Sequence, residues 1–232
     1  MKILFVNGSS RHRKGTTFRL IEMLKTGMER EDAQVNIIDV VSEHLNPCIA
    51  CYHCWKTGEG CIHNDRMSEI LEEMLGSDLI IFATPLYINN ISALMKQFME
   101  RTMPLCSRGF RQGREGIYQH VPKHKIPPIM LLCSCALPEK SHLDVVSLYY
   151  DKMAASWDTE VVGKILCTEA SLYDADYKQV KILLKDYENR MKEAGAEIAR
   201  NGYLSEKTEK NLNRILIRKD FYIQTAINSF LC

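Results

Sequence analysis

The sequence predicts an α/β fold in which a five-stranded parallel sheet is covered by helices on both faces. Short apolar runs alternate with longer amphipathic stretches along the chain, so that the order strand then helix repeats five times. This order is typical of parallel sheets, whose strands are buried on both faces. A length of 232 residues with 46% hydrophobic and 25% charged residues is ordinary for a globular protein with a full-sized core.

The predicted elements follow from these two periodicities, taken in chain order. The apolar runs of strand length are residues 2–6, 34–40, 79–84, 129–134 and 161–168. The amphipathic stretches of helical length are residues 17–30, 67–75, 91–101, 140–155 and 177–199. Residues 41–66 and 102–128 show neither pattern and are expected to be irregular loops, which often carry function.

The sequence divides into one domain, residues 1–200, and a C-terminal helical arm, residues 201–232. The arm carries apolar residues at intervals that suit helices packed on the body or on a second subunit. These residues are Leu212, Ile215, Leu216, Phe221, Tyr222, Ile227 and Phe230.

Charge and apolar patterning favour some classes of partner over others. Lys and Arg total 30 against 29 for Asp and Glu, a formal charge of +1, so there is no excess charge to attract nucleic acid or an anionic membrane. The apolar run at the N-terminus is too short for a signal peptide, and none approaches the ~18 residues of a membrane span. We therefore expect a cytoplasmic protein whose nine cysteines have metal, redox or buried roles rather than disulfide roles.

The loop after the first strand has the composition of an anion-binding site. Residues 7–17 read Asn-Gly-Ser-Ser-Arg-His-Arg-Lys-Gly-Thr-Thr and lead into the first helix, whose free amides and dipole favour a phosphate monoester. A Walker A loop needs its Lys directly before Ser or Thr, yet Gly15 follows Lys14, and glycines are too few for a dinucleotide fingerprint. The remaining alternative is a loop that only caps the helix.

The loop after the third strand suits a flat aromatic ligand. Residues 83–92 include Pro85, which stiffens the turn, Tyr87, which can face a ring, and Asn89, which can hydrogen-bond ring heteroatoms. Ligands of open α/β sheets bind at this edge, so the segment predicts one wall of an isoalloxazine site.

Three motifs together resemble one family. The Gly-Ser-Ser-Arg loop at 8–11, Thr-Pro-Leu-Tyr at 84–87 and Lys-Gln-Phe-Met-Glu-Arg at 96–101 resemble the NAD(P)H-dependent FMN reductases, and their iron-sulfur flavoprotein branch most. The family usually has Asp where this chain has Glu100. The resemblance implies a flavodoxin-like, doubly wound sheet of strand order 2-1-3-4-5, bound FMN, and a homodimer or homotetramer.

The resemblance also assigns residues to the flavin. It implies that Ser9, Arg11, Thr16 and Thr17 hold the phosphate, that Pro85, Leu86, Tyr87 and Asn89 line the ring, and that Ser134, Cys135 and Ala136 form a third flavin loop. The first loop is one residue longer than in the family, which leaves the roles of His12, Arg13 and Lys14 open.

Four cysteines form the third chemical signal. Cys48, Cys51, Cys54 and Cys61 have the spacing Cys-x2-Cys-x2-Cys-x6-Cys. Such closely set thiolates can surround a [4Fe-4S] cluster, and the resemblance places a compact cysteine motif in this loop. A zinc site, in which His53 or His63 could take part, and unligated thiols are the two alternatives.

These signals predict an FMN-dependent oxidoreductase that takes a hydride from NADPH or NADH. The electrons would pass to a quinone, a flavin or a similar small acceptor, or to an electron carrier. No side chain is expected to be catalytic, because the flavin carries the chemistry. The alternative is an iron-sulfur flavoprotein that transfers electrons between protein partners, such as a ferredoxin-like protein, and a flavin-binding regulator ranks last.

Overall fold

The five predicted strands form one parallel sheet. The computed structural model describes residues 1–113, 116–175 and 177–230. Within them the parallel strands follow the order β2-β1-β3-β7-β8, which confirms the predicted order 2-1-3-4-5. Their bounds are β1 (Lys2–Asn7), β2 (Gln34–Asp39), β3 (Leu79–Tyr87), β7 (Ile129–Ser134) and β8 (Val161–Cys167).

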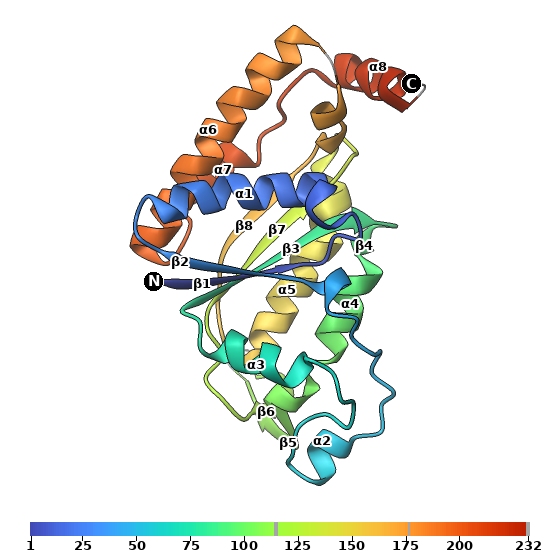
Figure 1. The fold of residues 1–232 in the computed structure, drawn as a ribbon, viewed down its shortest axis with the longest axis vertical. Helices are drawn as coiled ribbons and strands as arrows, with labels where there is room; N and C mark the ends of the chain where they lie inside the picture. The colour runs from blue at the N-terminus through green and yellow to red at the C-terminus, as the bar shows by residue number, and fades with distance from the viewer. Residues whose placement is uncertain (114–115, 176, 231–232) are drawn as a thin grey trace.

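Helices cover both faces of this sheet, as predicted. Figure 1 shows one group of them on one side of the sheet and a second group on the other. The first pair is α1 (Thr16–Glu29) and α6 (Lys178–Asn201), and the other three are α3 (Met67–Leu75), α4 (Ala93–Glu100) and α5 (Asp144–Trp157). Residues 140–143, predicted as the start of a helix, form a 3-10 turn ahead of α5.

Two hydrophobic layers result from the alternation of side chains along each strand. In β1, Leu4 and Val6 face the layer that includes Phe98 of α4. Ile3 and Phe5 face the opposite layer, which includes residues of α1 and α6. Both faces of each central strand are therefore buried, which is why these strands read as continuous apolar runs rather than alternating ones.

The third strand extends beyond its predicted end at Thr84. Leu86 and Tyr87 pair with a short antiparallel strand, β4 (Asn90–Ile91). The predicted start of the next helix at Ile91 is therefore wrong, because Ser92 is the N-cap of α4 and its side chain accepts a hydrogen bond from the Met95 amide.

The segment 102–128, expected to be irregular, contains an antiparallel hairpin. Its strands are β5 (Cys106–Gln112) and β6 (Tyr118–Pro122). The prediction missed it because the segment lacks an alternation of apolar and polar residues. A short helix, α2 (His53–Lys56), lies in the cysteine loop near this hairpin (Figure 1).

The C-terminal arm contains two helices, α7 (Glu206–Leu212) and α8 (Lys219–Phe230). Leu212 packs in the layer beside α1 and α6, and Tyr222 packs with Leu172. The last two residues of the predicted arm, 231 and 232, lie outside the described residues. In the part of the chain that the structure describes, no helix is both long enough and apolar enough to span a bilayer.

Candidate functional site

The loop after β1 packs closely under the first turn of α1. Gly15 is the N-cap of α1, and a Cβ atom there would lie 2.8 Å from the buried Ser9 Oγ, so the close approach requires glycine. Among the residues that the structure describes, no side chain caps the N-terminus of α1, and the first turn of this helix carries no acidic residue. The first amides of the helix are therefore open to an anion, as the sequence predicts.

A buried pair of hydroxyl groups joins this helix to the loop after β7. Thr17 Oγ1 and Ser134 Oγ lie 2.8 Å apart, and either can be the donor. Both residues are buried. The first and third predicted loops therefore meet at the carboxyl edge of the sheet.

Two of the three basic residues with open roles turn toward the end of β2. Asp39 is buried and accepts a hydrogen bond of 2.7 Å from the Asn7 side-chain amide. His12 Nε2 and Arg13 Nε each lie 3.5 Å from Asp39 Oδ2. Arg11, by contrast, reaches the cleft described next.

A cleft at the carboxyl edge of the sheet brings together most of the residues assigned to the flavin. Of those predicted, the cleft is lined by Ser9, Arg11, Thr16, Thr17, Pro85, Leu86, Tyr87, Ser134 and Ala136. Asn89 lies in the turn between β3 and β4, and Cys135 is buried with its Sγ accepting a hydrogen bond of 3.3 Å from the Leu137 amide. Neither belongs to the lining of this cleft, and both assignments stay predictions.

Sequence reasoning missed the fourth loop of the cleft, which follows β8. Ala170, Ser171 and Asp174 line the cleft together with Gly15. The predicted strand order could have indicated this loop. The carboxyl ends of all parallel strands meet at the same edge of the sheet, so the loop after the fifth strand lies beside the other loops.

The wall formed by residues 85–87 is fixed to the first loop. Ser92 Oγ donates a hydrogen bond of 2.5 Å to the Gly8 carbonyl, and the Ser92 amide donates one of 3.1 Å to Thr84 Oγ1. The turn that follows the wall has positive φ at both Ile88 and Asn89, 47° and 57°. Positive φ at both central residues is the geometry of a tight type I′ hairpin.

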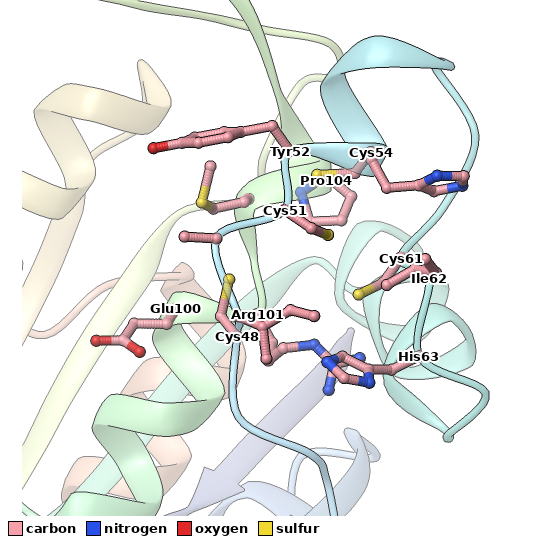
Figure 2. Close-up of a pocket in the computed structure, with 14 residues that line it drawn as sticks. Cys48, Cys51, Tyr52, Cys54, Cys61, Ile62, His63, Glu100, Arg101 and Pro104 are labelled. Carbon is pink, nitrogen blue, oxygen red and sulfur yellow. The ribbon is translucent and has the colours of Figure 1, made fainter.

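The four cysteines of the third motif line one pocket, together with other residues of their own loop and with Glu100 and Arg101 at the end of α4. Figure 2 shows the side chains of Cys48, Cys51 and Cys61 directed into a common space. Left-handed backbone at Ala50 and Tyr52 turns the chain between successive cysteines. The sequence motif is therefore a spatial cluster.

A buried guanidinium lies against this pocket. Arg101 is 1% exposed and donates two hydrogen bonds of 2.8 Å to the Asp65 carboxylate and one of 2.6 Å to the Asn46 carbonyl. The Arg101 hydrogen bonds to Asp65 are the strongest cause that holds the pKa of this carboxyl well below its usual range, and the Asn46 and Met67 backbone amides add to it by donating to the same carboxylate. Arg101 Nε and His63 Nε2 are buried without a hydrogen-bond partner among the described residues.

The thiols are close enough to affect one another electrostatically. Burial raises the pKa of the Cys54 thiol, the other three cysteines of the motif add to the rise, and Lys123 opposes it. Within the described residues, however, no three Cys, His, Asp or Glu side chains are placed to hold a single metal ion. A zinc site would gather its ligands around one ion, whereas the four irons of a [4Fe-4S] cluster would each take one thiolate, and both assignments stay predictions.

The first comparison with known proteins concerns the N-terminal half of the chain. Residues 1–115 match the family model described as NADPH-dependent FMN reductase. An iron-sulfur flavoprotein of Methanocaldococcus jannaschii is 32% identical over 119 residues. The chain belongs to the NADPH-dependent FMN reductase family. The resemblance drawn from the three motifs is thereby confirmed.

The relatives of this FMN reductase family member extend beyond the aligned segments. The M. jannaschii alignment covers 50% of this chain and 59% of that protein. An iron-sulfur flavoprotein of Archaeoglobus fulgidus is 30% identical over 163 residues, 70% of this chain and 66% of that protein. The chain thus matches less than two thirds of the length of either relative.

Solved structures share the fold. An FMN-dependent NADH-azoreductase from Bacillus anthracis in complex with FMN superposes with a TM-score of 0.60 at 16% identity, covering 85% of this chain and 99% of that one. An NAD(P)H:quinone oxidoreductase from Methanothermobacter marburgensis gives 0.58 at 15% identity, covering 88% and 96%. At these identities the comparison confirms the flavodoxin-like architecture alone.

Proposed function

We propose that this protein is an FMN-dependent oxidoreductase that takes a hydride from NADPH or NADH and reduces a small acceptor, such as a quinone or a flavin. The observation that carries the proposal is the cleft at the carboxyl edge of the sheet. The loop after β1 and the start of α1 give this cleft an uncapped helix N-terminus, Arg11 and buried hydroxyls. The end of β3 gives it the apolar wall Pro85–Leu86–Tyr87. An anion site beside a flat wall is what a phosphorylated ring requires.

The phosphate would be held by the first loop. Ser9, Thr16 and Thr17 offer hydroxyl groups beside the open amides of α1, and Arg11 offers a positive charge. Hydrogen bonds to a charged group are stronger than those between neutral groups, so this end of the cleft would supply most of the polar binding energy.

The ring would lie between the loops after β1, β3 and β7. Pro85, Leu86 and Tyr87 would cover it, Asn89 would approach its edge, and the backbone of 134–136 would face it. FMN, when bound, supplies the hydride and electron chemistry. The chain's own groups bind and orient it, and no side-chain nucleophile is required. The family model and the names of the solved neighbours support this assignment.

The test is titration of the purified protein with FMN, followed by oxidation of NADPH and NADH with a quinone or azo acceptor under anaerobic conditions. Thr17→Val keeps the side-chain shape and removes one hydroxyl, and Thr26→Val is the matched control on the same helix, where the hydroxyl bonds the Glu22 carbonyl. Loss of one hydrogen bond to a charged phosphate should weaken FMN binding about 10- to 100-fold. Absence of flavin binding by the unaltered protein would refute the proposal.

The second candidate function is electron transfer between protein partners through a [4Fe-4S] cluster on Cys48, Cys51, Cys54 and Cys61. Four thiols line one pocket. Beside it, Arg101 Nε and His63 Nε2 have no hydrogen-bond partner within the described ranges, and these donors would suit the sulfur atoms of a cluster. A ferredoxin-like protein would then exchange single electrons with this pocket. The names of the archaeal relatives support the same assignment.

Iron and acid-labile sulfide analysis of protein purified without oxygen tests the cluster. About four irons and four sulfides per chain are expected. Cys51→Ser should lower both, whereas Cys106→Ser, at a buried cysteine outside the pocket, should leave both unchanged. Flavin without iron would indicate a two-electron reductase with free thiols. Zinc in place of iron would indicate a zinc site on these cysteines.

We also propose a homodimer or homotetramer whose neighbouring subunit covers the cleft. Tyr87, Ile88 and Leu137, at or next to the cleft lining, are large apolar side chains left exposed in the single chain. Light scattering of the flavin-bound protein should give a multiple of the 26.7 kDa chain mass, and a monomeric mass would contradict this.

The cytoplasmic location stays a prediction that cell fractionation would test.

A further inference from the structure

The C-terminal arm is bonded to the loop after β8, which lines the cleft. Glu169 is 1% exposed and has left-handed backbone, with φ of 60°. Its carboxylate accepts a hydrogen bond of 2.6 Å from the Leu216 amide and one of 3.3 Å from the Ile217 amide. The next two residues, Ala170 and Ser171, line the cleft. A buried carboxylate that depends on the arm for its partners therefore sits beside the lining.

Tyr222 of α8 bonds the arm to the loop after β7. Tyr222 is 2% exposed, and its hydroxyl donates a hydrogen bond to the Ala136 carbonyl. The amide of the same peptide unit, that of Leu137, donates to Cys135 Sγ at 3.3 Å. Both polar groups of this peptide are thus engaged, which fixes its orientation at the point where Ala136 lines the cleft.

The same phenol also reaches the neighbouring loop. Burial raises the pKa of Tyr222, and a hydrogen bond with Ser171 opposes that rise. The two loops are joined directly, since the Ala170 amide donates to the Cys135 carbonyl at 2.9 Å and the Glu169 amide to the Leu137 carbonyl at 3.3 Å. Figure 1 shows α8 beside the turn that follows β8. Two cleft loops and the arm thus form one bonded unit.

We propose that Glu169 and Tyr222 are positioning residues, through which the C-terminal arm holds Ala136 and Ser171 at the distance and orientation that the flavin ring needs. The inference rests on the proposed function, because it assumes that FMN occupies this cleft. Neither residue lines the cleft itself, so each would act only through the backbone that it holds.

Point variants of the full chain test this role. Tyr222→Phe removes one hydroxyl and leaves the Ala136 carbonyl without its partner, and Glu169→Gln removes an acceptor of the two arm amides. Tyr203→Phe is the matched control, because Tyr203 is 51% exposed at the base of the arm and lines no part of the cleft. The readouts are the Kd for FMN, the absorption spectrum of the bound flavin, and urea unfolding of the protein without flavin.

Tyr222→Phe should weaken FMN binding about tenfold, the effect of one lost hydrogen bond, and should shift the bands of the bound flavin. Tyr203→Phe should change neither. A Tyr222→Phe protein that is destabilised but has an unaltered Kd and flavin spectrum would overturn the inference, since the arm would then be purely structural. If Glu169→Gln does not fold, Tyr222→Phe decides alone. Failure of the unaltered protein to bind FMN would instead refute the proposed function, and the inference with it.

Discussion

Arg101, at 1% exposed, is among the large side chains that the described part of the structure buries almost completely. Its bidentate pairing with Asp65 offsets the free-energy cost of removing both charges from water. Its third hydrogen bond, to the Asn46 carbonyl, fixes the start of the cysteine loop. The sequence marked this arginine only as the end of a family motif. Its burial against the cysteine pocket could not be read from the sequence, because Asp65 lies 36 residues away in a loop without periodicity.

Arg101→Met should lower the free energy of unfolding by about 3–5 kcal/mol, because it leaves the Asp65 carboxylate without its partner. Arg111→Met is the matched control, since its 2.7 Å ion pair with Asp158 is partly exposed and such pairs contribute about 0–1 kcal/mol. Urea unfolding of both variants measures the difference. Equal losses would show that Arg101 is no more important to stability than a surface ion pair.

The lowered pKa of Asp65 predicts a pH dependence of stability. Because the folded-state pKa lies below the ordinary value of 3.8, the contribution is fully present above that value and is lost as the pH falls through and below it. Asp65→Asn cannot ionise, so the gap in unfolding free energy between the unaltered protein and this variant should narrow from pH 6 to pH 3. A gap that does not change with pH would contradict the prediction.

At the scale of elements, α1 and α6 pack with their backbones in near contact. A Cβ at Gly27 would lie 1.8 Å from the Lys192 carbonyl oxygen, and one at Gly195 would lie 2.1 Å from the Leu24 carbonyl oxygen. Both helices were predicted from their periodicity. That they cross through two glycines was not, because each glycine taken alone only lowers helix propensity.

Gly195→Ala should therefore destabilise the protein by about 1–3 kcal/mol or more, since the clash is with backbone that cannot rotate away. Gly109→Ala is the control, because its nearest atoms would be 3.5 and 3.6 Å from the new Cβ, an ordinary contact. Thermal unfolding of the two variants is the measurement. A Gly195→Ala protein as stable as the control would show that α1 and α6 can move apart to admit the methyl group without loss of unfolding free energy.

At the scale of the whole molecule, the cleft exists only because loops far apart in the sequence meet at one sheet edge. The loops after β1, β3 and β7 contribute residues near 9–17, 85–87 and 134–136, and the loop after β8 adds residues 170–174. Parallel strand order β2-β1-β3-β7-β8 brings them together.

FMN should raise the unfolding temperature of the whole domain, because a ligand that binds only the folded state stabilises it by mass action, about 2.7 kcal/mol at one hundred times the Kd. Riboflavin at the same concentration should raise it less, since it lacks the phosphate that the first loop would bind. Thermal unfolding with each ligand measures this. Equal shifts would show that the first loop binds no phosphate.

The sequence by itself determined the five parallel strands, the helices on both faces and the motifs at the carboxyl edge of the sheet. It could do so because these features depend on local periodicity and on residue types at strand ends. Ser9, Thr17, Pro85 and Ser134, which the family resemblance assigned to the flavin, line one cleft at that edge.

Only the tertiary structure decided which side chains face one another across long sequence separations. It turned His12 and Arg13 toward Asp39, paired Arg101 with Asp65, and joined Glu169 and Tyr222 to the arm and the cleft loops. It also formed the β5–β6 hairpin in a segment without alternating polarity. These contacts depend on the packing of whole elements, and the identity of neighbouring residues in the chain does not specify packing.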